Sequence, residues 1–141
     1  KVLFYQFLKN NNSSERRSLE QLENITCIRG RDEVKFSFQM SEEEKKEVRS
    51  YHREQLRMLR NEVPNYDVLI LDEAVCVTGI GLLDEEELVS FLENKPKKLE
   101  VVLTGHTVSD RILQMADYVT EMKKVKHPFD RGVQARKGIE M

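Results

Sequence analysis

Four apolar residues in a row, at positions 68–71 (Val-Leu-Ile-Leu), end directly in two acidic residues, Asp72 and Glu73. The run is too short to be a buried helix, and it lacks the polar alternation of a strand with one solvated face. Short continuous apolar runs are typical of central strands in parallel sheets, which are covered on both faces. Because parallel strands need crossover connections, the run predicts a sheet whose strands are separated by helices.

The remaining sequence alternates between segments of strand and helix character. Strands are expected at residues 2–7, 25–28, 101–104 and 118–122, and helices at residues 15–23, between Ser41 and Pro64, after Asp84 and after Ser109. Ser41 and Asp84 are each followed three residues later by a glutamate, which is the spacing of a capping box. Residues 1–141 are expected to form one α/β domain with a mostly parallel sheet flanked by helices.

Apolar residues at helical spacing predict which side of each helix faces the core. His52 lies inside the apolar arc of the helix between Ser41 and Pro64, so it is expected to be a packed structural residue rather than a ligand. The expected core positions are Val48, Tyr51, Leu56, Met58 and Leu59 in this helix, Leu88, Val89 and Leu92 in the next, and Ile112, Leu113 and Ala116 in the last.

Charge and cysteine content narrow the classes of partner. The 23 basic and 25 acidic residues give a net charge of −2, so no overall basic field attracts nucleic acid or an anionic membrane. No apolar run approaches the roughly 20 residues that span a bilayer. The two cysteines, Cys27 and Cys76, form no CxxC pair, which favours a reducing compartment and a cytoplasmic location.

The acidic pair is the first candidate for chemistry. In an open parallel sheet, ligands bind beyond the carboxyl ends of the strands, where Asp72 and Glu73 are expected. Adjacent side chains point in different directions, so one carboxylate can hold a metal while the other anchors a loop. This is the Walker B arrangement, in which a carboxylate holds the Mg²⁺ of a bound nucleotide. The alternative is a solvated acidic pair that caps the next segment.

Thr104, Gly105 and His106 occupy the equivalent position after the next expected strand. Glycine lets the backbone approach a ligand closely, and here a hydroxyl and an imidazole flank it. An ordinary strand-to-helix turn is the alternative. No two of the three histidines have metal-ligand spacing and no cysteine accompanies them, so a zinc site is not expected.

Two further segments could contact a ligand. Phe36 and Phe38 lie in a stretch without helix or strand character, which suits a flat hydrophobic ligand, although both could belong to the core. Residues 123–137 could neutralise a polyphosphate or form a solvated end, because they include Lys123, Lys124, Lys126, Arg131, Arg136 and Lys137. Phe129 and Gly132 within this segment predict an ordered loop rather than a loose tail.

Several of these motifs occur in order along the chain: QFLK at 6–9, LDE at 71–73, LTG at 103–105, ADYVTEM at 116–122 and VKHPFDRGVQARKGIE at 125–140. Over nearly the whole chain they resemble the ATP:corrinoid adenosyltransferases of the BtuR/CobA type. The resemblance implies a P-loop NTPase fold of the RecA-like kind. It also implies transfer of the 5′-deoxyadenosyl group of ATP to the cobalt(I) of a reduced corrinoid, with release of triphosphate, in the biosynthesis or salvage of adenosylcobalamin.

The resemblance further implies roles for particular residues and partners. Glu73 would hold Mg²⁺ with support from Asp72, and Phe36 and Phe38 would pack near the corrin and exclude its lower axial ligand. The implied partners are ATP, the reduced corrinoid, an electron-donating reductase and a second copy of the chain, with no nucleic acid and no membrane. The further expected contacts of ATP or the corrinoid are Thr104, Gly105, His106, Lys126 and Phe129.

The sequence departs from the family pattern in three places. The Gly-rich P-loop with its Lys-Thr pair does not precede Lys1, so a first strand, P-loop and first helix of roughly 30 residues are expected to be missing, and the chain as written to be weak or inactive. Lys35 and Phe38 stand where the family has Gly and Trp. His106 stands where the family usually has Arg, which replaces a bidentate triphosphate contact with a weaker, pH-dependent donor.

These departures leave a second function open. A corrinoid- or nucleotide-binding module without catalysis would also fit a chain that lacks a P-loop and carries His106 in place of Arg. A nucleic-acid motor of RecA-like fold is disfavoured by the near-neutral charge, the small size and the lack of motor motifs.

Overall fold

The structure, a computed structural model, describes residues 1–136 and 139 of the chain. Within these residues one sheet has the strand order β2-β1-β3-β4, and every neighbouring pair is parallel. The strands are β1 (Val2–Gln6), β2 (Ile25–Cys27), β3 (Val68–Asp72) and β4 (Glu100–Leu103). The α/β fold with a parallel sheet is confirmed, and β3 is an interior strand as its apolar run predicts.

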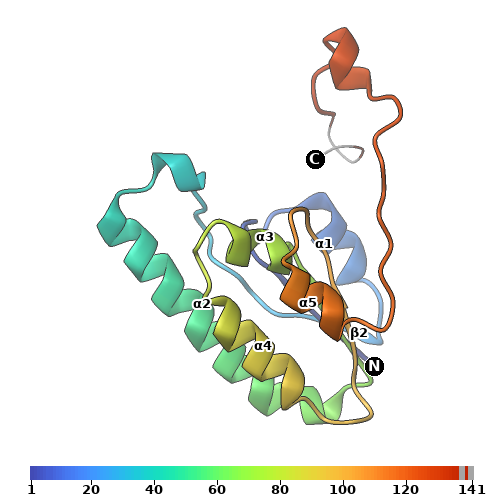
Figure 1. Ribbon diagram of the computed structural model, residues 1–141. Coiled ribbons are helices and arrows are strands. Elements are labelled where there is room, and N and C mark those ends of the chain that lie inside the picture. Colours follow the sequence, from blue (N-terminus) through green and yellow to red (C-terminus); the bar gives the residue numbers. More distant parts are fainter. Residues whose placement is uncertain (137–138, 140–141) are drawn as a thin grey trace.

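Helices cover both faces of this sheet. The helices α2 (Glu42–Glu62) and α4 (Glu85–Glu93) lie side by side on one face, and α1 (Ser14–Leu19) lies on the other (Figure 1). The remaining helical segments are α3 (Ala74–Gly79), α5 (Asp110–Met115) and three 3₁₀ turns, η1 (Ser37–Gln39), η2 (Val63–Asn65) and η3 (Pro128–Arg131). No helix in the described part of the chain combines the length and apolar character needed to cross a membrane.

The ends of the two long helices follow from their capping residues. At the start of α2, the Ser41 side chain accepts from the Glu44 backbone N–H, and the Glu44 carboxylate accepts from the Ser41 N–H, so the predicted capping box is present. Pro64 lies in the 3₁₀ turn that ends this helix. Asp84 caps α4, but its side chain accepts from Glu86 rather than from the predicted third position.

The main core lies between the sheet and the α2–α4 layer. Alternate residues of β1 and β3 face this layer, and Leu3, Leu69 and Leu71 are fully buried there. The opposite face is less evenly covered: Phe4 is buried there, but its neighbour Ile70 on β3 is only half-buried. The core continues through Tyr5, Phe7, Val48, Leu56, Leu59, Val63, Leu82, Leu83, Leu88, Val89, Phe91 and Leu99.

Several expected core positions are more exposed than their sequence pattern predicts. The strand expected at residues 101–104 is an edge strand rather than a buried one, and Val102 is 45% exposed. Met58 on α2 is 43% exposed, because it lies at the border of the apolar arc rather than at its centre. Ala116 is exposed because α5 ends at Met115.

The expectation of a last strand at residues 118–122 is wrong. The chain leaves the sheet after α5 and runs as an irregular segment away from the body of the molecule (Figure 1). Tyr118 and Met122 are each 94% exposed. β-forming side chains do not make a strand by themselves, since strand propensity reflects packing against neighbours that this segment lacks. The helix expected at residues 15–23 is also shorter than predicted, and α3 follows β3 where no helix was expected.

His52 is a buried structural residue, as predicted. Its side chain is 3% exposed, its Nδ1 lies 2.9 Å from the Leu82 carbonyl oxygen, and its ring meets the edge of Phe7. Burial lowers the pKa of His52 more than the Leu82 carbonyl raises it, and the nearby Arg31 lowers it further. The surroundings of His52 in the folded protein therefore favour its neutral form.

Neutral His52 makes the stability of the fold depend on pH. The ordinary pKa of histidine is about 6.5, and below this pH the unfolded chain binds a proton at His52 more readily than the folded protein does. The free energy of unfolding therefore falls with decreasing pH, by at most about 1.4 kcal/mol per pH unit. His52→Gln keeps an N–H donor for Leu82 but does not titrate, so its stability should change less between pH 7.5 and 5.5. Urea unfolding at both values measures the difference. Val48→Ala, a core variant on the same helix, should keep the wild-type dependence, and an unchanged slope in His52→Gln would contradict the assignment.

Candidate functional site

A single hydroxyl group joins the ends of β3 and β4. The parallel register pairs Leu71 with Leu103, so the next residues, Asp72 and Thr104, lie side by side. The Thr104 hydroxyl donates to Asp72 Oδ1 at 2.7 Å and accepts from the Glu73 backbone N–H at 3.0 Å. The two predicted acidic residues and the predicted hydroxyl therefore form one connected group at the carboxyl edge of the sheet, where ligands bind in folds of this class.

Asp72 is committed to this network through both of its carboxylate oxygens. While Oδ1 accepts from Thr104, Oδ2 accepts from Gln6 Nε2 at 3.2 Å and lies 3.5 Å from Lys9 Nζ. Gln6 ends β1 and Lys9 follows it, so the contacts connect three parallel strands. A carboxylate with this many partners is suited to orienting its neighbours.

Lys9, Gln6 and Glu15, which surround Asp72, were not among the predicted site residues. Lys9 Nζ donates to Glu15 Oε1 at 2.6 Å, and Gln6 Nε2 donates to the same oxygen at 3.0 Å. Partial burial opposes the ionisation of Glu15, but these hydrogen bonds outweigh it and lower the pKa of Glu15. The sequence feature that could have identified Lys9 is its position after an apolar strand, which it shares with Asp72 and Thr104.

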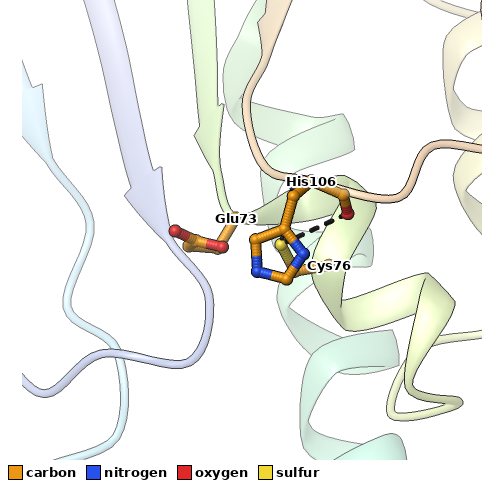
Figure 2. A group of neighbouring side chains, drawn as sticks. All are labelled: Glu73, Cys76 and His106. Atoms are coloured by element: carbon orange, nitrogen blue, oxygen red, sulfur yellow. Dashed lines mark hydrogen bonds between the residues drawn. The ribbon is translucent and has the colours of Figure 1, made fainter. Parts of the chain in front are cut away.

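Glu73 differs from Asp72 in its surroundings. Its backbone is left-handed (φ 61°) at the point where β3 runs into α3, and within the described residues its half-buried carboxylate has no cationic partner. Its neighbours are the Cys76 thiol and the His106 imidazole, and the three side chains gather at this edge of the sheet (Figure 2). A carboxylate whose charge is not balanced by a neighbouring cation fits a hard cation such as Mg²⁺.

Gly105 is required by the close approach of two segments. Its φ is +137°, and a Cβ placed on it would lie 2.6 Å from Val75 Cγ2 and 2.8 Å from Cys76 Sγ. The backbone also bonds across this contact, since the Val75 N–H donates to the Thr104 carbonyl at 3.3 Å. Only glycine lets the segment after β4 lie this close to α3.

Backbone strain is concentrated at the same edge. Of the described residues, the non-glycines with positive φ are Leu8, Glu73 and Thr107, at 56°, 61° and 65°. Each follows the carboxyl end of a strand, β1, β3 or β4. Such conformations cost of order 1–3 kcal/mol and cluster at functional sites, so their placement supports a site here rather than ordinary turns.

Cys76 was not among the predicted site residues. Along the sequence no cysteine lies beside a histidine, but the fold brings Cys76 into contact with His106. The His106 backbone N–H donates to Cys76 Sγ at 3.1 Å, although the residues are 30 positions apart. Burial raises the pKa of the Cys76 thiol, and the neighbouring Glu73 carboxylate raises it further. Spacing rules for metal ligands within one segment cannot find a pair that a strand–helix–strand unit brings together.

Phe36 and Phe38 form an exposed pair, so the alternative that they belong to the core is wrong. Their side chains are 70% and 81% exposed, and the rings stack with centroids 5.4 Å apart and planes 14° apart. Lys35 and Met40, on either side of the pair in sequence, line a cavity of about 190 Å³ that extends to Lys9. The cavity thus connects the region of the aromatic pair with the Asp72 network.

The predicted contacts from the C-terminal segment do not lie with the others. Lys126 and Phe129 are exposed on the segment that runs away from the sheet (Figure 1). The prediction of local order around Phe129 is confirmed by the turn η3, in which His127 Nδ1 accepts from the Phe129 N–H and Gly132 closes the turn at φ 78°. Lys137 lies outside the described residues.

Replacement of Gly105 should show how much the site depends on this close approach. Gly105→Ala should lower the free energy of unfolding by about 2–4 kcal/mol, because a methyl group would collide with Val75 and Cys76 in a strained conformation. Gly132→Ala has a positive φ but nothing within 4 Å, so it should cost only about 1 kcal/mol. Urea unfolding of both variants measures the difference, and equal losses would count against the crowding at Gly105.

Comparisons with known proteins agree on one family. A sequence model described as ATP:corrinoid adenosyltransferase BtuR/CobO/CobP matches residues 1–141. Corrinoid adenosyltransferase CobA of Salmonella typhimurium is 39% identical over 84 residues, which are 60% of this chain and 42% of that protein. Corrinoid adenosyltransferase of Sinorhizobium sp is 40% identical over 74 residues, 52% of this chain and 35% of that protein.

Corrinoid adenosyltransferase of Escherichia coli is 39% identical over 74 residues, 52% of this chain and 38% of that protein. The chain therefore spans less than half the length of the curated relatives it matches. The family match nevertheless extends from the first residue to the last. The chain belongs to the ATP:corrinoid adenosyltransferase BtuR/CobO/CobP family.

Proposed function

We propose that the protein transfers the 5′-deoxyadenosyl group of ATP to the cobalt of a reduced corrinoid and releases triphosphate. The observation that carries this proposal is the family match over all 141 residues. The relatives compared above are named corrinoid adenosyltransferases, which supports an enzyme of the same class.

In the proposed reaction, the protein itself forms and breaks no covalent bond. Cobalt(I) of the substrate attacks the ribose 5′ carbon, a cobalt–carbon bond forms, the C5′–O bond breaks, and triphosphate leaves with the electron pair. Because the nucleophile belongs to the substrate, the chain has to orient two substrates, exclude water and neutralise charge. Binding surfaces and charged groups are therefore the features to assign.

Glu73, Asp72 and Thr104 are the proposed phosphate end of the site. Mg²⁺ bound there would neutralise negative charge on the triphosphate. Glu73 is the residue suited to hold it, since its carboxylate lacks a cationic partner among the described residues, whereas Asp72 is committed to Thr104, Gln6 and Lys9. Asp72 would act through Thr104, whose hydroxyl also holds the backbone of Glu73.

The aromatic pair and its neighbouring cavity are the proposed corrinoid end. Stacked and exposed, Phe36 and Phe38 offer a flat apolar surface of the kind that a corrin ring can cover. Gly105 and His106 would contact ATP beside Glu73. Lys126 and Phe129 would reach either substrate only after the segment that follows α5 folds back toward the sheet, so their proposed role includes that movement.

The proposal includes the partners that the chemistry requires. Cobalt(I) must be generated by a one-electron donor, so a reductase would act before the transfer. A reducing, cytoplasmic location suits both that substrate and the two free thiols, Cys27 and Cys76. A homodimer is part of the proposal on the strength of the family alone.

The decisive experiment is an assay of the full-length protein with ATP, Mg²⁺ and a chemically reduced corrinoid. The adenosylated corrinoid should form, and its absorbance spectrum measures the rate. Glu73→Gln should lower the rate on the order of 10- to 100-fold or more, because it removes the anionic ligand proposed for Mg²⁺. Glu23→Gln is a matched control, since Glu23 is exposed just before β2, at the opposite edge of the sheet.

Failure to form product would overturn the proposal. If ATP or the corrinoid still bound without reaction, the non-catalytic binding module would be the correct alternative. Full activity in Glu73→Gln would leave the enzyme class intact but would remove Glu73 from the phosphate end of the site.

Thr104 offers a second test of the same network. Thr104→Val removes the hydroxyl that links Asp72 to the Glu73 backbone, so the rate should fall on the order of tenfold or more, with a higher Mg²⁺ requirement. Thr104→Ser keeps the hydroxyl and should stay near wild type. A serine variant as impaired as the valine variant would show that the methyl group, not the hydrogen bonds, matters.

A further inference from the structure

Three different metal-ligating side chains meet beside the proposed phosphate end of the site. Glu73, Cys76 and His106 each offer one ligand atom, and these atoms all lie within 4.8 Å of one another. They come from two segments, because Glu73 and Cys76 lie where β3 turns into α3, whereas His106 follows β4 (Figure 2). The group supplies one oxygen, one sulfur and one nitrogen.

The backbone already holds this group together. The His106 N–H donates to Cys76 Sγ at 3.1 Å, and the Cys76 thiol lies 3.6 Å from the His106 carbonyl oxygen. Gly105 allows the approach, since a side chain there would strike Cys76. The His106 N–H directed at sulfur favours the thiolate that binds metal, whereas burial and the Glu73 carboxylate favour the thiol until a cation is bound.

The kind of cation follows from the kinds of ligand. Mg²⁺ takes oxygen ligands, whereas thiolate and imidazole favour Zn²⁺ and similar borderline-soft ions. The ligand atoms lie up to 4.8 Å apart, and zinc bonds of about 2.0–2.3 Å require somewhat shorter separations. The His106 side chain is exposed, so it can rotate to bring its ring nitrogen closer to the other two ligand atoms.

We infer that Glu73, Cys76 and His106 form a binding site for Zn²⁺ or a divalent ion of similar softness. On binding, the thiol proton of Cys76 passes to solvent and the sulfur bonds to the metal. The exposure of His106 leaves the fourth tetrahedral position open to water. Binding itself is independent of the proposed enzymatic activity.

One consequence does rest on the proposed function. Glu73 would be a ligand both of the Mg²⁺ of adenosyl transfer and of the softer ion. The two cations would therefore compete for the same carboxylate. Zn²⁺ would therefore inhibit the transfer reaction, and Cys76→Ser would weaken that inhibition.

The test is a titration of the full-length protein with Co²⁺ in the absence of ATP and corrinoid. Bound Co²⁺ should give a thiolate-to-cobalt charge-transfer band in the near ultraviolet, and added Zn²⁺ should abolish it. Cys76→Ser should lose the band, and His106→Ala should weaken binding on the order of 10- to 100-fold or more. Cys27→Ser is the matched control and should keep the band, because Cys27 lies on β2, away from the group.

Two results would overturn the inference. Co²⁺ binding without a charge-transfer band would exclude sulfur as a ligand. Wild-type affinity in His106→Ala would exclude the imidazole, and this variant remains informative even if replacement of the buried Cys76 disturbs folding. Both readouts are spectroscopic, so they hold whether or not the protein transfers adenosyl groups.

Discussion

The Thr104 hydroxyl is the contact on which the arrangement of the site depends. It donates to the Asp72 carboxylate and accepts from the Glu73 N–H, so it fixes two adjacent residues that point in different directions. The contact exists because β3 and β4 are parallel and in register up to Leu71 and Leu103. A shift of one residue between these strands would place the hydroxyl on the other face of the sheet and separate the three groups.

The same edge of the sheet carries the backbone strain, and the core makes that possible. Leu8, Glu73 and Thr107 have left-handed conformations within four residues of the ends of three neighbouring strands. Each costs of order 1–3 kcal/mol, and a strained residue persists only where its surroundings hold it in place. Leu3 of β1 and Leu69 and Leu71 of β3 are fully buried, so they anchor two of the strands that precede the strained residues.

Local patterns predicted the parts of the fold that depend on local physics. The Ser41 cap and the apolar run of β3 need only neighbouring residues, and strand order then brings Asp72 to Thr104. The Cys76–His106 contact could not be found this way, because it depends on the space left by a glycine. The strand expected around Tyr118 is absent, because its local strand propensity is not accompanied, among the described residues, by a neighbouring strand with which it could pair.

At the proposed site, the identity of a bound cation would be decided by the neighbours of Glu73 rather than by Glu73 itself. Phosphate oxygens of a nucleotide would complete a hard site around this carboxylate and favour Mg²⁺. Cys76 and His106 would complete a softer site around the same group. Because Asp72 is held by Thr104, Gln6 and Lys9, it cannot compensate for the loss of Glu73 to the softer ion. The proposed transfer reaction would accordingly be sensitive to which cation is bound at Glu73.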